Sequence, residues 1–118
     1  MLMNHPFKLL YGRSGVYRIW FGDRFYIGSS SNIYNRMRLH ESDLSRYLGK
    51  GRLAPESGSW QANLIGEDTD RVIVGRVEIL DICSEEDHFM LEDQYLKAAE
   101  GDPRCLNSRF YVTKKCQK

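Results

Sequence analysis

Cysteine is scarce in this chain, and its spacing excludes two common ways of stabilising a small protein. The three cysteines, Cys83, Cys105 and Cys116, are an odd number, lie far apart and form no CxxC pair. This pattern argues against a disulfide framework and against a zinc knuckle. We therefore expect free thiols in a reducing compartment.

Long hydrophobic runs are also missing. No apolar run approaches the length needed to cross a bilayer, and no extended hydrophobic segment follows a basic start at the N-terminus. Neither a membrane span nor a secretory signal is indicated, so we expect a cytosolic protein that does not bind a membrane.

Histidine pairs at metal-binding spacing are lacking as well. Neither His5 nor His88 has a partner at such a spacing, so any metal should be held by oxygen. The acidic residues 67–70 could bind a cation, but they lack the spacing of an EF-hand, and we interpret them as a solvated turn.

The composition that remains is that of one ordinary globular domain. The chain has 118 residues, of which 42% are hydrophobic and 28% charged. Its net charge of +1 is unevenly distributed, because residues 1–60 carry nine Lys or Arg against four Asp or Glu, while residues 61–118 carry eight against twelve. A basic first half suits attraction to phosphates.

The pattern that organises the chain is a pair of β-like runs around a short turn. It begins with GVY at residues 15–17, turns at Gly22-Asp23 and returns with YIG at residues 26–28. β-branched and aromatic residues on both sides of a Gly/Asp turn are typical of a hairpin. Antiparallel pairing would place Tyr17 and Tyr26 on neighbouring strands, where they could face the same cleft.

A helix is expected directly after this hairpin. Asn32 can cap its start with a side-chain oxygen. An apolar stripe then follows the helix, formed by Ile33, Met37 and Leu44. Arg36 and His40, four residues apart, lie along one border of this stripe. Taken alone, they have an alternative interpretation as a solvated surface pair.

The order of these residues resembles the GIY-YIG nuclease superfamily, whose name comes from the two tripeptides. At residues 15–17 Val16 replaces the commoner Ile with another β-branched residue, and residues 26–28 match fully. Either tripeptide alone is a weak signal. The two tripeptides together are a specific signal, because they have the spacing of a hairpin and are followed by Arg36 and His40 on a helix.

The resemblance implies a single domain with an α+β fold, in which a small, mainly antiparallel three-stranded sheet is flanked by helices. Residues 15–107 would form the catalytic core, between an N-terminal arm at 1–14 and a basic tail at 108–118. Residues 71–82 form the longest β-like segment and should be the central or third strand, and Gly75 suggests a bulge or a close approach by another backbone.

Two further helices are expected in the second half. Ser59 can cap a brief one that ends before Gly66 and places Trp60 in the core. Ser84 should begin a longer one that runs to about Glu100.

An acid lies among the apolar residues of this last helix. The side expected to be buried contains Phe89, Leu91, Tyr95, Leu96 and Ala99. Glu92 projects from the middle of that side, where a carboxylate is costly unless it meets an arginine such as Arg36, binds a cation, or lies at the floor of a wet cleft. In the family a glutamate on the helix after the third strand binds the metal. The resemblance assigns this role to Glu92.

The activity implied by the resemblance is that of a DNA endonuclease that uses one divalent cation, Mg²⁺ or Mn²⁺, and leaves 5′-phosphate and 3′-hydroxyl ends. Arg36 would bind the scissile phosphate, since a planar guanidinium matches phosphate oxygens and stays charged. Tyr17 would activate the attacking water, and Tyr26 would bind phosphate or support Tyr17. Gly28 would let the backbone pass close to the site.

The general base is left open between two residues. Tyrosine has an unperturbed pKa near 10, so Tyr17 would need help to accept a proton. His40, with an unperturbed pKa of about 6.5, is better matched, or it could take the proton from Tyr17 in a relay. If His40 carries this step, His40→Ala should lower turnover by roughly 10²–10⁴-fold.

Further contacts with DNA are expected beside the site. Arg46, Lys50 and Arg52 lie near glycines, in a segment able to follow a phosphate backbone or to form a solvated loop. Asn107 matches an asparagine in the final element of the family, and its amide could orient site residues or a phosphate. An ordinary turn residue is the alternative.

The biological role is less determined by the sequence. Four roles fit: a phage or mobile-element (homing-like) nuclease, which would act in the host cytoplasm, a restriction-type enzyme, a repair nuclease, and the catalytic fragment of a longer protein. Strong specificity would need a homodimer or an accessory DNA-recognition partner, because the domain is small. The competing hypothesis is a catalytically inactive nuclease-like fold that serves as a DNA-binding or interaction module.

Overall fold

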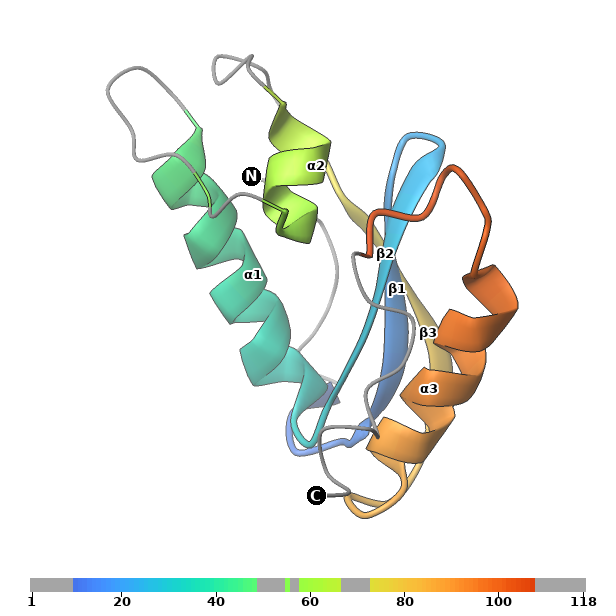
Figure 1. Ribbon diagram of the computed structural model, residues 1–118. Helices are drawn as coiled ribbons and strands as arrows, with labels where there is room; N and C mark the ends of the chain where they lie inside the picture. The colour runs from blue at the N-terminus through green and yellow to red at the C-terminus, as the bar shows by residue number, and fades with distance from the viewer. Residues whose placement is uncertain (1–9, 49–54, 56–57, 67–72, 108–118) are drawn as a thin grey trace.

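The computed structural model describes residues 10–48, 55, 58–66 and 73–107. Within these residues the elements are β1 Gly15–Phe21, β2 Arg24–Ser30, α1 Ile33–Tyr47, α2 Trp60–Ile65, β3 Arg76–Ile82 and α3 His88–Ala99. The strands form an antiparallel sheet in the order β2-β1-β3. Figure 1 shows α1 and α2 on one side of this sheet and α3 on the other, so the expected α+β fold is confirmed.

Alternation along β1 gives the sheet a hydrophobic core on each face. Tyr17, Ile19 and Phe21 pack on the side of α1 and α2, whereas Val16 packs with the Leu96 side chain of α3. Successive side chains of a strand point to opposite faces, so the central strand joins both cores. No helix in the described ranges is long and apolar enough to cross a bilayer.

The hairpin and the first two helices follow their local signals. β1 and β2 pair across the two-residue turn at Gly22-Asp23, where Gly22 takes a φ of 67°. Asn32 caps α1 by accepting a hydrogen bond from the Asn35 backbone N–H at 3.3 Å. Ser59 caps α2 in the same way. These three predictions are confirmed.

The third strand differs in detail from the prediction. β3 begins at Arg76, and residues 67–72, which include the predicted acidic turn, lie outside the described residues. The register shift between β1 and β3 does not lie at Gly75. Val16 pairs with Asp81 but Tyr17 with Ile79, so the intervening residue of β3 is the extra one.

The last helix begins later than predicted. Ser84 starts a turn closed by the Asp87 backbone N–H, which donates to the Ser84 carbonyl at 3.1 Å, and α3 begins at His88. Phe89 was expected to be buried, but its side chain is 46% exposed. The reason is that the contacts of α3 with the apolar core begin at Leu91, whereas Phe89 in the first turn borders a polar pocket.

Candidate functional site

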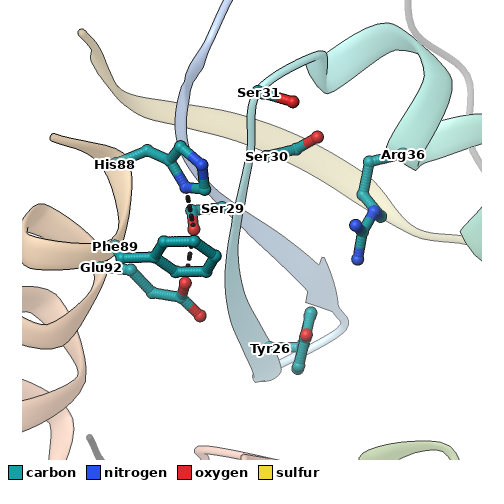
Figure 2. A pocket seen from close by; sticks show the side chains of 8 residues that line it. All are labelled: Tyr26, Ser29, Ser30, Ser31, Arg36, His88, Phe89 and Glu92. Carbon is teal, nitrogen blue, oxygen red and sulfur yellow. Dashed lines mark hydrogen bonds between the residues drawn. The ribbon is translucent and has the colours of Figure 1, made fainter. Parts of the chain in front are cut away.

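A polar pocket of about 460 Å³ opens between β2, α1 and α3. It is lined by Tyr26, Ser29, Ser30, Ser31, Arg36, His88, Phe89 and Glu92. Figure 2 shows that α3 supplies one wall and the Arg36 side chain of α1 the opposite wall, with the end of β2 between them. Three of the five predicted catalytic residues, Tyr26, Arg36 and Glu92, therefore meet in one pocket.

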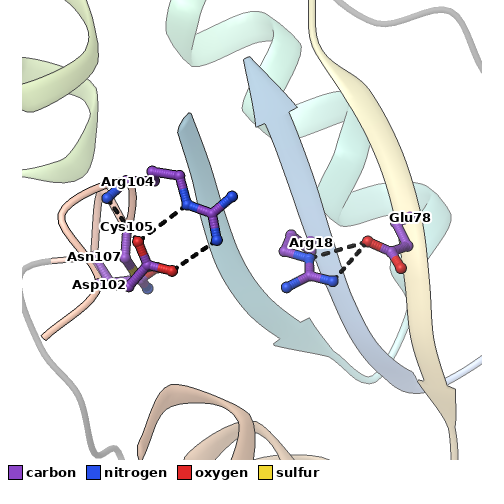
Figure 3. A network of polar contacts seen from close by, with 6 residues as sticks. All are labelled: Arg18, Glu78, Asp102, Arg104, Cys105 and Asn107. Atoms are coloured by element: carbon purple, nitrogen blue, oxygen red, sulfur yellow. Dashed lines mark hydrogen bonds and ion pairs between the residues drawn. The ribbon is translucent and has the colours of Figure 1, made fainter. Parts of the chain in front are cut away.

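The C-terminal segment fixes the edge of the strand that leads into this pocket. The Phe25 backbone N–H donates to the Arg104 carbonyl at 3.0 Å, and the Leu106 N–H donates to the Phe25 carbonyl at 2.7 Å. Asp102 holds the segment in shape by accepting hydrogen bonds from the backbone and the guanidinium of Arg104 (Figure 3). The segment thus acts as a short extra strand beside β2.

Asn107 completes this attachment with its side chain. Its Oδ1 accepts from the Ile27 backbone N–H at 2.9 Å, and its Nδ2 donates to the Ile27 carbonyl at 2.8 Å. The side chain does not line the pocket. Asn107 therefore holds the strand that carries Tyr26 and Gly28.

Glu92 is the residue best suited to hold a cation. Its side chain is only 7% exposed although it lines the pocket. The Ser29 hydroxyl donates a hydrogen bond to its Oε1. Mg²⁺ prefers oxygen ligands and commonly keeps several waters beside one or two carboxylates. One buried carboxylate beside the serine hydroxyls of a polar pocket fits such an ion, although within the described residues no three His, Cys, Asp or Glu side chains form a metal-binding group.

Tyr26 reaches the pocket from a packed aromatic surface. Its ring stacks on Trp60, with centroids 4.3 Å apart, so the predicted structural role of Trp60 includes support for a site residue. Burial, and then the charge of Glu92, raise the pKa of the Tyr26 phenol well above its usual value, and Arg36 opposes this shift. The phenol is therefore a hydrogen-bond donor at neutral pH.

Tyr17 and His40 form a buried pair behind the pocket. Their side chains are 0% and 5% exposed, and the Tyr17 hydroxyl lies 2.7 Å from His40 Nε2. Burial raises the pKa of Tyr17, whereas burial and then the Arg36 charge lower the pKa of His40 to about 3. Both groups are neutral at pH 7, and neither lines the pocket.

Gly28 has no side chain, and the Tyr17 hydroxyl occupies the space where a Cβ would lie. A Cβ at this position would lie 2.5 Å from the Tyr17 hydroxyl oxygen and 3.0 Å from a ring carbon of Tyr26. This glycine therefore makes room for the two tyrosine side chains, and it does not line the pocket.

The predicted basic DNA-contacting segment is only partly described. Arg46 is exposed near the end of α1, pairs with Asp43 at 2.7 Å and does not line the pocket. Lys50 and Arg52 lie outside the described residues.

Four polar residues of the pocket, Ser29, Ser30, Ser31 and His88, were not predicted as site residues. Ser29 Oγ lies 2.8 Å from His88 Nδ1 and also bonds Glu92, so one hydroxyl joins two residues of α3 to β2. Burial lowers the pKa of His88; the charge of Glu85 opposes this shift, whereas the charge of Arg36 adds to it. The sequence held one usable signal, since His88 and Glu92 are four residues apart and therefore share a helix face.

The chain matches none of the protein-family models, curated proteins and solved structures with which it was compared.

Proposed function

We propose that this protein is a divalent-metal-dependent DNA endonuclease of the GIY-YIG type, which hydrolyses phosphodiester bonds to 5′-phosphate and 3′-hydroxyl ends. The observation that carries the proposal is the meeting of Tyr26, Arg36 and Glu92 in one pocket, from three elements spread over 67 positions of the chain. Their chemistry is complementary, because the first donates a hydrogen bond, the second is a cation and the third is an acid.

Each of these residues has a distinct task in phosphodiester hydrolysis. Arg36 binds the non-bridging oxygens of the scissile phosphate and offsets the negative charge that grows there in the transition state. Tyr26 donates its phenolic hydrogen to the same phosphate. Glu92 would hold the divalent cation, which would neutralise phosphate charge and polarise water. The volume of about 460 Å³ is sufficient for a phosphate group with its first-shell waters.

The Tyr17–His40 pair has a supporting role in this scheme. The centroid of the Tyr26 ring lies 5.6 Å from that of the His40 ring and 6.5 Å from that of the Tyr17 ring. Both contacts are edge-on or tilted, so the pair restricts the ring of Tyr26 without reaching a substrate. We accordingly treat Tyr17 and His40 as positioning residues.

A plasmid-nicking assay tests the proposal. Wild-type protein should convert supercoiled DNA to the nicked form with Mg²⁺ or Mn²⁺ and not with EDTA. Glu92→Gln should lower this rate by about 10²-fold or more, because even the loss of a group that only orients a metal ligand costs about 10–100-fold. Glu86→Gln is the matched control, because this exposed acid precedes the same helix outside the pocket.

Two results would contradict the proposal. The first is DNA binding without any metal-dependent nicking by the wild type, which would favour a binding module. The second is equal nicking by the wild type and Glu92→Gln. End-labelling of the cleaved strand supplies an independent check, since the proposal requires a 5′-phosphate.

A further inference from the structure

Hydrolysis in this pocket requires a group that takes a proton from the attacking water. A general base must lie within hydrogen-bond reach of that water. Tyr17 and His40 are bonded to each other at 2.7 Å and are 0% and 5% exposed. Because neither lines the pocket, the two candidates from the sequence do not meet this requirement.

His88 does meet it. The ring lines the pocket from the first turn of α3 although the residue is only 6% exposed overall. Its Nδ1 lies 2.8 Å from Ser29 Oγ. The ring nitrogen left for a ligand is Nε2, and no described residue bonds to it. Figure 2 shows Nε2 on the side of the ring away from Ser29 and Glu92.

The hydrogen bonds of Ser29 determine which nitrogen of His88 carries the proton. A hydroxyl has one hydrogen to donate, and a carboxylate can only accept. Ser29 therefore gives its hydrogen to Glu92 and accepts one from His88 Nδ1. In a neutral ring with Nδ1 protonated, Nε2 has a free lone pair. The chain from Glu92 through Ser29 thus prepares Nε2 as a proton acceptor.

We infer that His88 is the general base of the reaction, a role that rests on the proposed nuclease function. One O–H bond of the water breaks and its proton moves to Nε2, while the water oxygen bonds to phosphorus. The bond from phosphorus to the 3′ oxygen then breaks, and that oxygen takes a proton from solvent. His88 finally returns its proton to solvent. The positive charge held meanwhile is offset by Glu92 through Ser29.

The first test compares two substitutions that differ in what they keep. His88→Ala removes the whole ring, whereas His88→Asn keeps an N–H donor for Ser29 and removes the acceptor at Nε2. Both should lower turnover by about 10²–10⁴-fold, with DNA affinity measured without metal unchanged. Met90→Ala, at an exposed position of the same helix, should act like the wild type. Added imidazole should restore part of the activity of His88→Ala.

The second test does not involve activity. Long-range ¹H–¹⁵N spectra of the metal-free protein should show His88 with Nδ1 protonated and Nε2 unprotonated, and Ser29→Ala should remove this preference. Protonated Nε2 in the wild type would overturn the inference.

The outcomes separate this inference from the function on which it rests. Full turnover in His88→Asn, together with an inactive Glu92→Gln, would overturn the role of His88 and leave the nuclease in place. A wild type without metal-dependent nicking would overturn both. A loss of activity in His88→Ala that His88→Asn does not share would show that the ring only fills space.

Discussion

A buried histidine that cannot take up a proton makes the folded state sensitive to acid. His40 is enclosed between Tyr17, Tyr26 and Trp60, and its Nε2 is already engaged by the Tyr17 hydroxyl. Its pKa is lowered to about 3 in the folded chain, chiefly by burial. The unfolded chain, with a histidine pKa of about 6.5, binds this proton first as the pH falls.

The stability of the protein should therefore fall between pH 6.5 and pH 3. Over this range the titration of His40 should lower the free energy of unfolding by at most about 1.4 kcal/mol for each unit by which the pH falls. Above pH 7 this titration should make no contribution to the pH dependence. His40→Gln should be less stable at pH 7 but show a shallower dependence on pH. Part of the slope should remain, because the pKa of His88 is lowered too.

Urea unfolding at pH 7, 6 and 5 measures this effect. Parallel curves for the wild type and His40→Gln would mean that the folded protein accepts a proton at His40. His40 would then become available again as a base.

At the scale of an element, β2 depends on the segment that follows α3. The backbone of Phe25 pairs with this segment, and both polar groups of the Ile27 backbone are engaged by the one side chain of Asn107. Tyr26 lies between these two attachment points. The position of a pocket residue is thus set by hydrogen bonds made 80 positions away in the chain.

Asn107→Ala should lower the free energy of unfolding by about 1–3 kcal/mol, because it leaves the Ile27 N–H and C=O without their partner. Chemical denaturation measures the loss. Asn35→Ala is the control, since this exposed residue contributes only its backbone N–H to the α1 cap. An unchanged stability with a weakened affinity for DNA would instead assign Asn107 to the phosphate.

At the scale of the whole molecule, the charge of the pocket should be visible in the salt dependence of DNA binding. Arg36 is exposed on α1 and faces the pocket, whereas Arg38, two residues on, lies near the Tyr34 ring and does not line it. When a protein cation neutralises a phosphate, the counterions of that phosphate are released. Each such contact makes the affinity fall more steeply as the salt concentration rises.

Arg36→Ala should reduce the slope of log K against log salt by about one, and Arg38→Ala should leave it unchanged. Fluorescence anisotropy with labelled duplex DNA in EDTA gives both slopes without cleavage. Equal slopes for the wild type and Arg36→Ala would remove Arg36 from the phosphate site.

The parts of the fold that the sequence predicted are those with a local cause. The turn at Gly22-Asp23 and the caps at Asn32 and Ser59 are decided by neighbouring residues, and all three are confirmed. The start of α3 was placed too early because Ser84 and the acids after it have the composition of a helix start but form a separate turn. Composition alone does not distinguish the two.

The candidate site likewise has one part that the sequence predicted and one part that depends on tertiary packing. Tyr26, Arg36 and Glu92 were found through a resemblance in the order of residues along the chain. The bond between Ser29 and His88 joins residues 59 positions apart. It exists only because α3 packs beside β2, so the spacing of His88 and Glu92 could indicate a shared helix face but not this bond.

The segment beside β2 also affects how the protein behaves in concentrated solution. An open sheet edge can recruit extended chains from other molecules and start aggregation. Here Arg104, Leu106 and Asn107 occupy the positions that such a strand would take at Phe25 and Ile27. A substitution that detaches this segment would therefore expose the edge of β2 to pairing with other chains. We expect such a variant to aggregate and become insoluble.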